Sequence, residues 1–128
     1  MIDYDSLPAS FNNDCIAALQ IVNREIKADT QDGWFKIEYR SSNVPELVAY
    51  FNLEHPRSRD ISNSPVLTSQ IAATLLSYCP INRFLIYGHD GYHTEHDVWV
   101  GYKVVDGALV EMSVCETETT YYDFCDDL

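Results

Sequence analysis

Hydrophobic side chains recur at helical spacing early in the chain and then change to the alternation of a strand. Between residues 14 and 28, five apolar side chains share one helical stripe: Cys15, Ala18, Leu19, Val22 and Ile26. This spacing predicts an amphipathic helix. From Trp34 to Tyr39, apolar and charged residues alternate. That alternation predicts a half-buried strand, which begins after the break at Gly33.

Two further helices are expected in the middle of the chain. In Asn43-Val44-Pro45-Glu46, a capping residue, an early proline and a carboxylate three residues after the cap precede an apolar run that ends at Leu53. These features predict a short helix. The polar stretch from His55 to Asn63 is expected to be an exposed loop. Ser64-Pro65 predicts the cap of a third helix, which Pro80 ends.

The C-terminal half has the pattern of a strand meander. Phe84–Tyr87 is a short apolar run suited to a central strand, and two more strands are expected over Val98–Val105 and Ala108–Cys115. Asp106-Gly107 predicts a hairpin between them, because both residues can adopt positive φ. Neither repeats nor a domain linker are visible. The sequence therefore predicts one acidic α+β domain over residues 1–128. Its antiparallel sheet of about four strands would pack against three helices, in the order α-β-α-α-β-β-β.

Charge is distributed unevenly along this domain. The 128 residues include 20 acidic and 8 basic side chains, so that the formal net charge is −12. After residue 83 the chain carries ten acids and one base, Lys103, which places −9 of that charge in its C-terminal third. Such a field repels nucleic acid and anionic lipid and attracts basic proteins. We therefore expect no direct binding of nucleic acid or membranes.

The sequence indicates neither a membrane helix nor a secretion signal. No apolar stretch approaches the roughly 18 residues that a membrane span requires, and the first residues are acidic where a signal peptide would be basic. These features predict a cytoplasmic protein. The four cysteines (Cys15, Cys79, Cys115 and Cys125) are widely scattered and lack the close spacing of a zinc or redox site. This favours reduced thiols over disulfides.

The segment from Gly88 to Asp97 has the densest set of potential metal ligands. Three imidazoles and three carboxylates fall within nine residues: His89, Asp90, His93, Glu95, His96 and Asp97. Zinc and similar metals bind such groups. The glycines and the missing apolar periodicity, however, favour a polar loop over a metal centre, because ligands need rigid support. Glycine patterns for phosphate binding and nucleophile signatures are absent, so no cofactor is expected.

The tail from Glu116 to Leu128 interleaves carboxylates with three aromatic side chains, Tyr121, Tyr122 and Phe124. Tyrosine is enriched in the cores of protein interfaces, and carboxylates can pair with lysine and arginine of a basic partner. The tail is therefore a candidate contact surface. A solvated terminus is the alternative interpretation.

The order of elements and the pattern of the C-terminal half resemble the nuclease A inhibitor family, small acidic proteins that bind a non-specific DNA/RNA endonuclease and block it. The closest pattern lies in Arg83–Gly88, Asp97–Tyr102 and Leu109–Ser113. The resemblance implies that acidic groups near the chain's end approach the nuclease, and Glu116-Thr117-Glu118-Thr119 are their counterparts here. This chain differs by continuing nine residues past Thr119 and by its histidine-rich loop.

We therefore expect a stoichiometric, immunity-type inhibitor that occupies the basic active cleft of a nuclease or nucleic-acid-binding protein by mimicking the charge of phosphate. The expected partner contacts are Asp90, Glu95, Glu116, Glu118, Tyr121, Tyr122 and Asp123. One alternative is a phage-encoded DNA mimic that antagonises a host defence complex. A second alternative is a small metal-dependent hydrolase that uses His89, His93 and His96.

Overall fold

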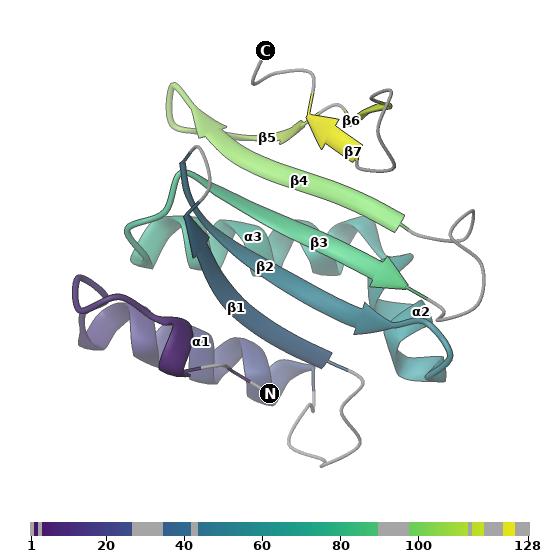
Figure 1. The fold of residues 1–128 in the computed structure, drawn as a ribbon, viewed down its shortest axis with the longest axis horizontal. Helices are drawn as coiled ribbons and strands as arrows, with labels where there is room; N and C mark the ends of the chain where they lie inside the picture. Colours follow the sequence, from purple (N-terminus) through teal and green to yellow (C-terminus); the bar gives the residue numbers. More distant parts are fainter. Residues whose placement is uncertain are drawn as a thin grey trace.

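A five-stranded sheet with helices on one side forms the framework of the protein (Figure 1). The computed structural model describes residues 2, 4–26, 35–41, 44–89, 98–112, 114–116 and 122–124, with the backbone alone at 62, 89, 98–99, 114–116 and 122–124. In chain order the elements are η1 (Tyr4–Ser6), α1 (Asn13–Glu25), β1 (Phe35–Ser41), β2 (Pro45–Asn52), α2 (Pro56–Ser62), α3 (Pro65–Tyr78), β3 (Arg83–His89), β4 (Val98–Val105), β5 (Ala108–Met112), β6 (Val114–Glu116) and β7 (Tyr122–Phe124).

The main sheet is mixed. Its spatial order is β1-β2-β3-β4-β5, and β6 and β7 pair separately. The β1–β2 pair is antiparallel, β2 and β3 run parallel, and β3, β4 and β5 form an antiparallel meander. The helices α2 and α3 make the crossover that a parallel pair requires. The predicted α+β class and the meander are confirmed, whereas the expected four-stranded, purely antiparallel sheet is wrong.

The additional strand is β2, where the sequence predicted a helix. Leu47 and Ala49 belong to the core beneath the helices, Val48 belongs to a second cluster on the opposite face, and all three are buried. A short continuous apolar run fits a strand buried on both faces as well as a buried helix. Pairing with β1 and β3 decides between them. Glu46, expected in a capping box, instead contacts the side chains of Arg40 and Arg83.

The segment predicted as an exposed loop contains the short helix α2. His55 caps it, because its Nδ1 accepts a hydrogen bond from the backbone N–H of Arg57 at 3.2 Å, and Pro56 occupies the first turn. Ile61 is buried and anchors the helix to the core. A single apolar anchor produces no periodicity, which explains why the pattern indicated a loop. From α1 to β5 the order of elements is therefore α-β-β-α-α-β-β-β.

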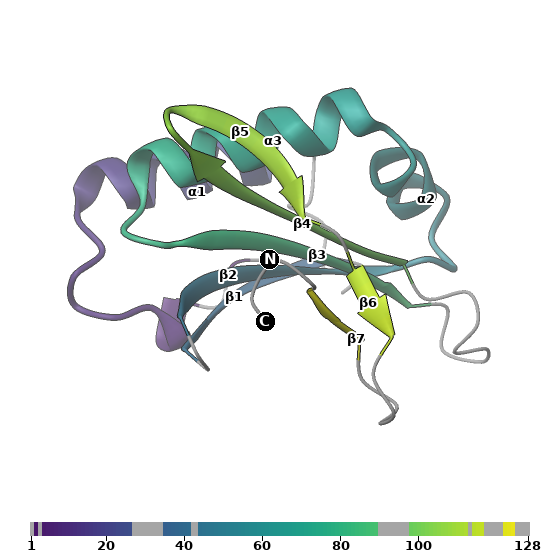
Figure 2. The same ribbon diagram turned by 90° about the horizontal axis from the view of Figure 1, so that it is seen from above.

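The helices α1 and α3 cover one face of the sheet (Figure 2). The predicted apolar stripe of α1 is confirmed, since all five of its side chains are buried. The predicted cap of α3 is confirmed as well, because the Ser64 hydroxyl accepts a hydrogen bond from the Leu67 N–H at 3.3 Å. A hydrogen bond between the hydroxyl groups of Thr68 and Tyr102, 2.9 Å apart, connects α3 to β4.

No described helix has both the length and the apolar character needed to cross a membrane.

A disulfide joins Cys15 of α1 to Cys79 at the end of α3. The prediction of reduced thiols is therefore wrong for this pair. The two cysteines are 64 residues apart in sequence, and the packing of α1 beside α3 brings their Cα atoms to 4.6 Å. Proximity of this kind depends on helix packing and leaves no trace in local spacing.

Candidate protein-binding edge of the sheet

The β4–β5 hairpin forms one edge of the main sheet. Its turn is the predicted Asp106-Gly107, with φ values of 52° and 81°. Val105 pairs with Ala108 across this turn, which leaves a loop of two residues. Positive φ at both loop positions matches the right-handed twist of the flanking strands. The hairpin prediction is therefore confirmed, and the turn determines the register of β5.

This register establishes which backbone groups of β5 point out of the sheet. In a two-residue hairpin the closing pair exchanges both of its backbone hydrogen bonds, and bonded pairs then alternate along the ladder. Ala108, Val110 and Met112 therefore direct their N–H and C=O groups toward β4. Leu109 and Glu111 direct theirs away from the sheet. Among the described residues, no backbone group pairs with that outer side of β5.

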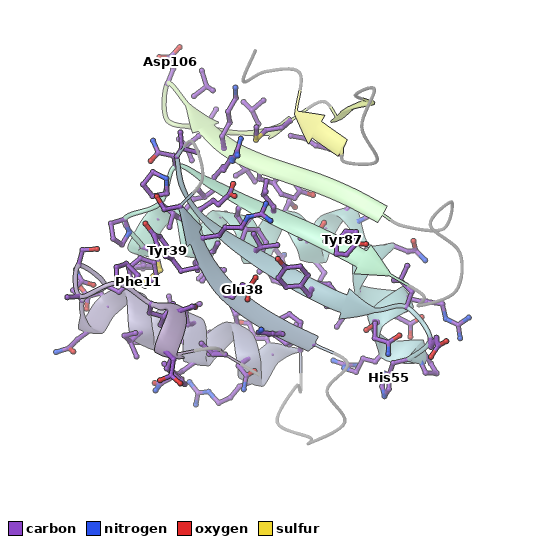
Figure 3. The ribbon with its side chains drawn as sticks, in the orientation of Figure 1. Phe11, Glu38, Tyr39, His55, Tyr87 and Asp106 are labelled. Atoms are coloured by element: carbon purple, nitrogen blue, oxygen red, sulfur yellow. A yellow bond between two sulfur atoms is a disulfide. The ribbon has the colours of Figure 1, made fainter. Side chains whose placement is uncertain are left out.

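Apolar and acidic side chains are mixed on the surface around this edge. Val104, Val105 and Val110 keep 49%, 43% and 36% of their area exposed. Val105 and Val110 lie on the face opposite the helices, and Val104 lies on the helix side, where it pairs with Leu109. The carboxylates of Asp106 and Glu111 are exposed beside them. Asp106 marks the tip of the hairpin in Figure 3.

Three of the predicted contact residues come together in a small ladder next to the hairpin. Glu116 of β6 pairs with Tyr122 of β7, and Asp123 lies at the adjacent position of β7. The strand β6 contacts β4. We call the hairpin segment 104–111 together with β6 and β7 the acidic edge. The other predicted contacts lie outside the described residues: Asp90, Glu95, Glu118 and Tyr121.

Three basic side chains on the sheet face opposite the helices are paired with carboxylates. Arg40, Glu46 and Arg83 form a row across β1, β2 and β3. Arg40 donates from Nε to one oxygen of Glu46 at 2.7 Å, and Arg83 donates from Nε to the other. Glu46 is fully buried, and the side chain of Arg83 is 7% exposed. Two guanidinium groups therefore share one carboxylate that water does not reach.

A second charged group lies beside this row on the same face. Lys36 and Glu38 are 3.1 Å apart between Nζ and Oε2. Burial raises the pKa of Glu38, but hydrogen bonds from Tyr50 and Lys36 outweigh that effect, so its pKa lies below the ordinary value. Burial, followed by the hydrogen bond to Glu38, raises the pKa of Tyr50 to about 12. Tyr87 packs edge-to-face on Tyr50. Figure 3 shows Glu38 and Tyr87 on the sheet face that no helix covers, which we call the open face.

The open face and the acidic edge differ in whether their charged side chains form ion pairs. On the open face, Lys36, Arg40 and Arg83 all engage carboxylates. At the acidic edge, Asp106 and Glu111 form no ion pair within the described part of the chain. Internal pairing therefore compensates the charge of these three basic side chains, whereas the carboxylates of Asp106 and Glu111 stay exposed.

No protein family, curated protein or solved structure matches the chain. The resemblance to the nuclease A inhibitor family therefore stays a prediction.

Two hollows lie away from the acidic edge. A hollow of about 180 Å³ between α1 and α3 is lined mainly by Ala17, Ala18, Ile21 and Tyr78. A larger, more polar one of about 430 Å³ lies between the N-terminal segment and α1.

Within the described residues, no group of three or more histidine, cysteine or acidic side chains is placed to hold a metal ion. Of the proposed histidine ligands, His89 ends β3, while His93 and His96 lie outside those residues.

Sequence reasoning missed the row of Arg40, Glu46 and Arg83, which we call the ion row, and it missed the unpaired outer side of β5, which we call the open edge. The alternation of Lys36, Glu38 and Arg40 in β1 places three charged side chains on one face, which was a usable signal for the open-face cluster. The pairing of Glu46 with Arg83 could not be inferred, because Glu46 was assigned to a helix cap. The open edge becomes apparent only when the spatial order of the strands is known.

Proposed function

We propose that the protein is a stoichiometric, immunity-type inhibitor that binds the basic cleft of a nuclease or another nucleic-acid-binding protein through its acidic edge. The observation that carries this proposal is the segregation of charge. Lys36, Arg40 and Arg83 are each paired with a carboxylate, and Arg83 is buried as well, whereas Asp106 and Glu111 are exposed and form no ion pair in the described structure.

The chemistry of a phosphate-binding cleft matches such an edge. Basic clefts hold phosphate with arginine and lysine, and a carboxylate accepts the same charge-assisted hydrogen bonds. Long-range attraction by a chain of net charge −12 would accelerate association. The exposed valines 104, 105 and 110 would add apolar contact, which slows dissociation once the two surfaces meet.

Reconstitution with a purified partner tests the proposal. A protein retained from lysate of the native cell is purified, and its cleavage or binding of DNA is titrated with the inhibitor. We expect the activity to be lost at a 1:1 ratio. The double variant Asp106→Lys/Glu111→Lys should weaken inhibition by at least about tenfold at low salt, which corresponds to about 1.4 kcal/mol. The difference should shrink as salt screens the charges.

A matched control separates the acidic edge from net charge. Glu25→Lys/Glu54→Lys changes the net charge by the same amount at two exposed positions outside the acidic edge. It should slow association only slightly. Equal losses for the two double variants would refute the assignment to this edge, and inhibition that requires excess inhibitor would refute the stoichiometric mechanism.

The cytoplasmic location expected from the sequence stays a prediction. Structural disulfides persist mainly in oxidising compartments, so the Cys15–Cys79 bond argues against a reducing one. Thiol trapping in intact cells would test this directly. Oxidised Cys15 and Cys79 would exclude a constantly reducing location.

A further inference from the structure

We propose that β5 binds the partner by pairing with one of its extended segments, so that the main sheet gains a sixth strand at the acidic edge. This inference rests on the proposed function for the basic character of the partner. The outer backbone of β5, in contrast, lacks a partner among the described residues whatever the charge of the binding protein.

Within the described residues, the outer edge of β5 is open, whereas that of β1 is partly covered. At β1, Ile2 forms a parallel bridge with Ile37, and the Ser6 hydroxyl accepts a hydrogen bond from the Tyr39 N–H at 3.0 Å. No described residue plays such a part beside Leu109 and Glu111 of β5. An unpaired edge of this kind is a template for another strand.

The side chains of β5 specify what such a strand would carry. Leu109 and Glu111 lie on the helix side of the sheet, and Leu109 packs against the core there. Val110 points to the opposite face, in register with Lys103 of β4. Directly opposed side chains on neighbouring strands interact, and opposite charges favour pairing. A fitting segment therefore alternates basic residues, which face Glu111, with apolar residues, which face Val110.

Charge decides between this occupant and a second copy of the chain. Two β5 strands could pair about Val110, with Leu109 of each opposite Glu111 of the other. That arrangement would bring together two chains of net charge −12 along their acidic edges. The terminal residues of the chain are a poor occupant for the same reason, because they include Asp126 and Asp127. A basic segment from another protein meets no such repulsion.

Proline at position 111 tests strand addition separately from charge. The N–H of Glu111 points away from β4, so Glu111→Pro blocks the outer edge and leaves the β4–β5 ladder intact. Glu111→Gln removes the same charge and keeps the N–H. The probe is a ten-residue peptide of alternating lysine and valine, and its binding is measured by fluorescence anisotropy. We expect the proline variant to bind at least about tenfold more weakly than the glutamine variant, since outer-edge hydrogen bonds are lost.

A second measurement uses the unaltered protein, so that the test does not depend on how well the proline variant folds. The same peptide with every backbone nitrogen methylated keeps its charges but cannot donate strand hydrogen bonds. We expect it to bind at least about tenfold more weakly than the unmodified peptide. Only the unmodified peptide should slow hydrogen exchange at the amides of Leu109 and Glu111.

Each result has a distinct meaning. Equal binding of the two peptides, without slower exchange at Leu109 and Glu111, would overturn strand addition and leave charge-driven inhibition intact. Failure to find any basic protein that is inhibited at a 1:1 ratio would instead refute the proposed function. Slow exchange of both amides in the free protein would show that the chain's own tail occupies the edge. Exchange that slows with protein concentration, together with dimers in ultracentrifugation, would assign the edge to a second copy.

Discussion

The two edges of the main sheet differ in how their polar groups are satisfied. Beside β1, an N-terminal segment covers the backbone, and the charged side chains of the strand pair with neighbours on the open face. Beside β5, the outer backbone has no described partner, and the two carboxylates are exposed. Proteins normally cover or protect their edge strands because open ones associate. The protein's own residues thus engage the polar groups of the β1 side, and the β5 side is where we propose that a partner binds.

The largest expected effect on the unfolding free energy comes from the ion row, which begins at β1. Glu46→Gln removes the charge that compensates Arg83, which is 7% exposed, and we expect it to cost about 3–5 kcal/mol of unfolding free energy. Glu111→Gln on the open side should change stability by less than about 0.5 kcal/mol. Urea unfolding of both variants measures the difference.

A paired substitution checks the cause of that loss. Glu46→Leu combined with Arg83→Met replaces the buried charges by apolar groups, and this should restore much of the stability that Glu46→Gln loses. Similar stabilities for Glu46→Gln and Glu111→Gln would show that the two sides of the sheet do not differ as proposed.

The disulfide is expected to have the second largest effect, also on the β1 side. Reduction of the Cys15–Cys79 bond should cost about 2–4 kcal/mol, because the cross-link restricts the unfolded chain. Its loss loosens α1, which follows η1 directly, and η1 contacts β1. Hydrogen exchange should therefore accelerate more in β1 than in β5. Equal acceleration in both strands would contradict this asymmetry.

Local signals in the sequence were sufficient for part of this fold. The helices α1 and α3 and the β4–β5 hairpin follow from apolar periodicity, from a serine cap before proline and from Asp106-Gly107. Each of these signals acts within a few residues. The candidate edge could be predicted only as far as its acidic character and its turn.

The parts that sequence reasoning missed all depend on distant neighbours. The strand β2 was predicted as a helix because Asn43-Val44-Pro45-Glu46 has the features of a helix start and precedes an apolar run, and only its position between β1 and β3 requires a strand. The disulfide depends on the packing of α1 beside α3, and the ion row depends on the register of three strands. The open side of β5 depends on the order of the whole sheet. None of these relations appears in local spacing.

A smaller effect is expected from the single hydroxyl that covers part of the β1 edge. Ser6→Ala removes the acceptor of the Tyr39 N–H and should cost about 1 kcal/mol. Exchange at the Tyr39 amide should then approach the fast exchange expected at Leu109 and Glu111. Ser77→Ala is the matched control, because its hydroxyl bonds only within the exposed side of α3. Unchanged exchange at Tyr39 would show that Ser6 does not cover the edge.

The smallest effect concerns the pH dependence of stability on the β1 side. The folded pKa of Glu38 lies below its unfolded value of 4.5, because hydrogen bonds from Tyr50 and Lys36 outweigh the opposing effect of burial. Ionised Glu38 therefore stabilises the fold above about pH 4.5, and this contribution is lost as the pH falls through the lowered folded pKa. We expect Glu38→Gln to cost about 0.5 kcal/mol at pH 7 and progressively less in acid.

Unfolding free energies of the wild type and Glu38→Gln between pH 7 and pH 3 would test this prediction. The two curves should converge in acid, because protonation removes from the wild type what the substitution has already removed. A difference in unfolding free energy that stayed constant from pH 7 to pH 3 would contradict the lowered pKa of Glu38.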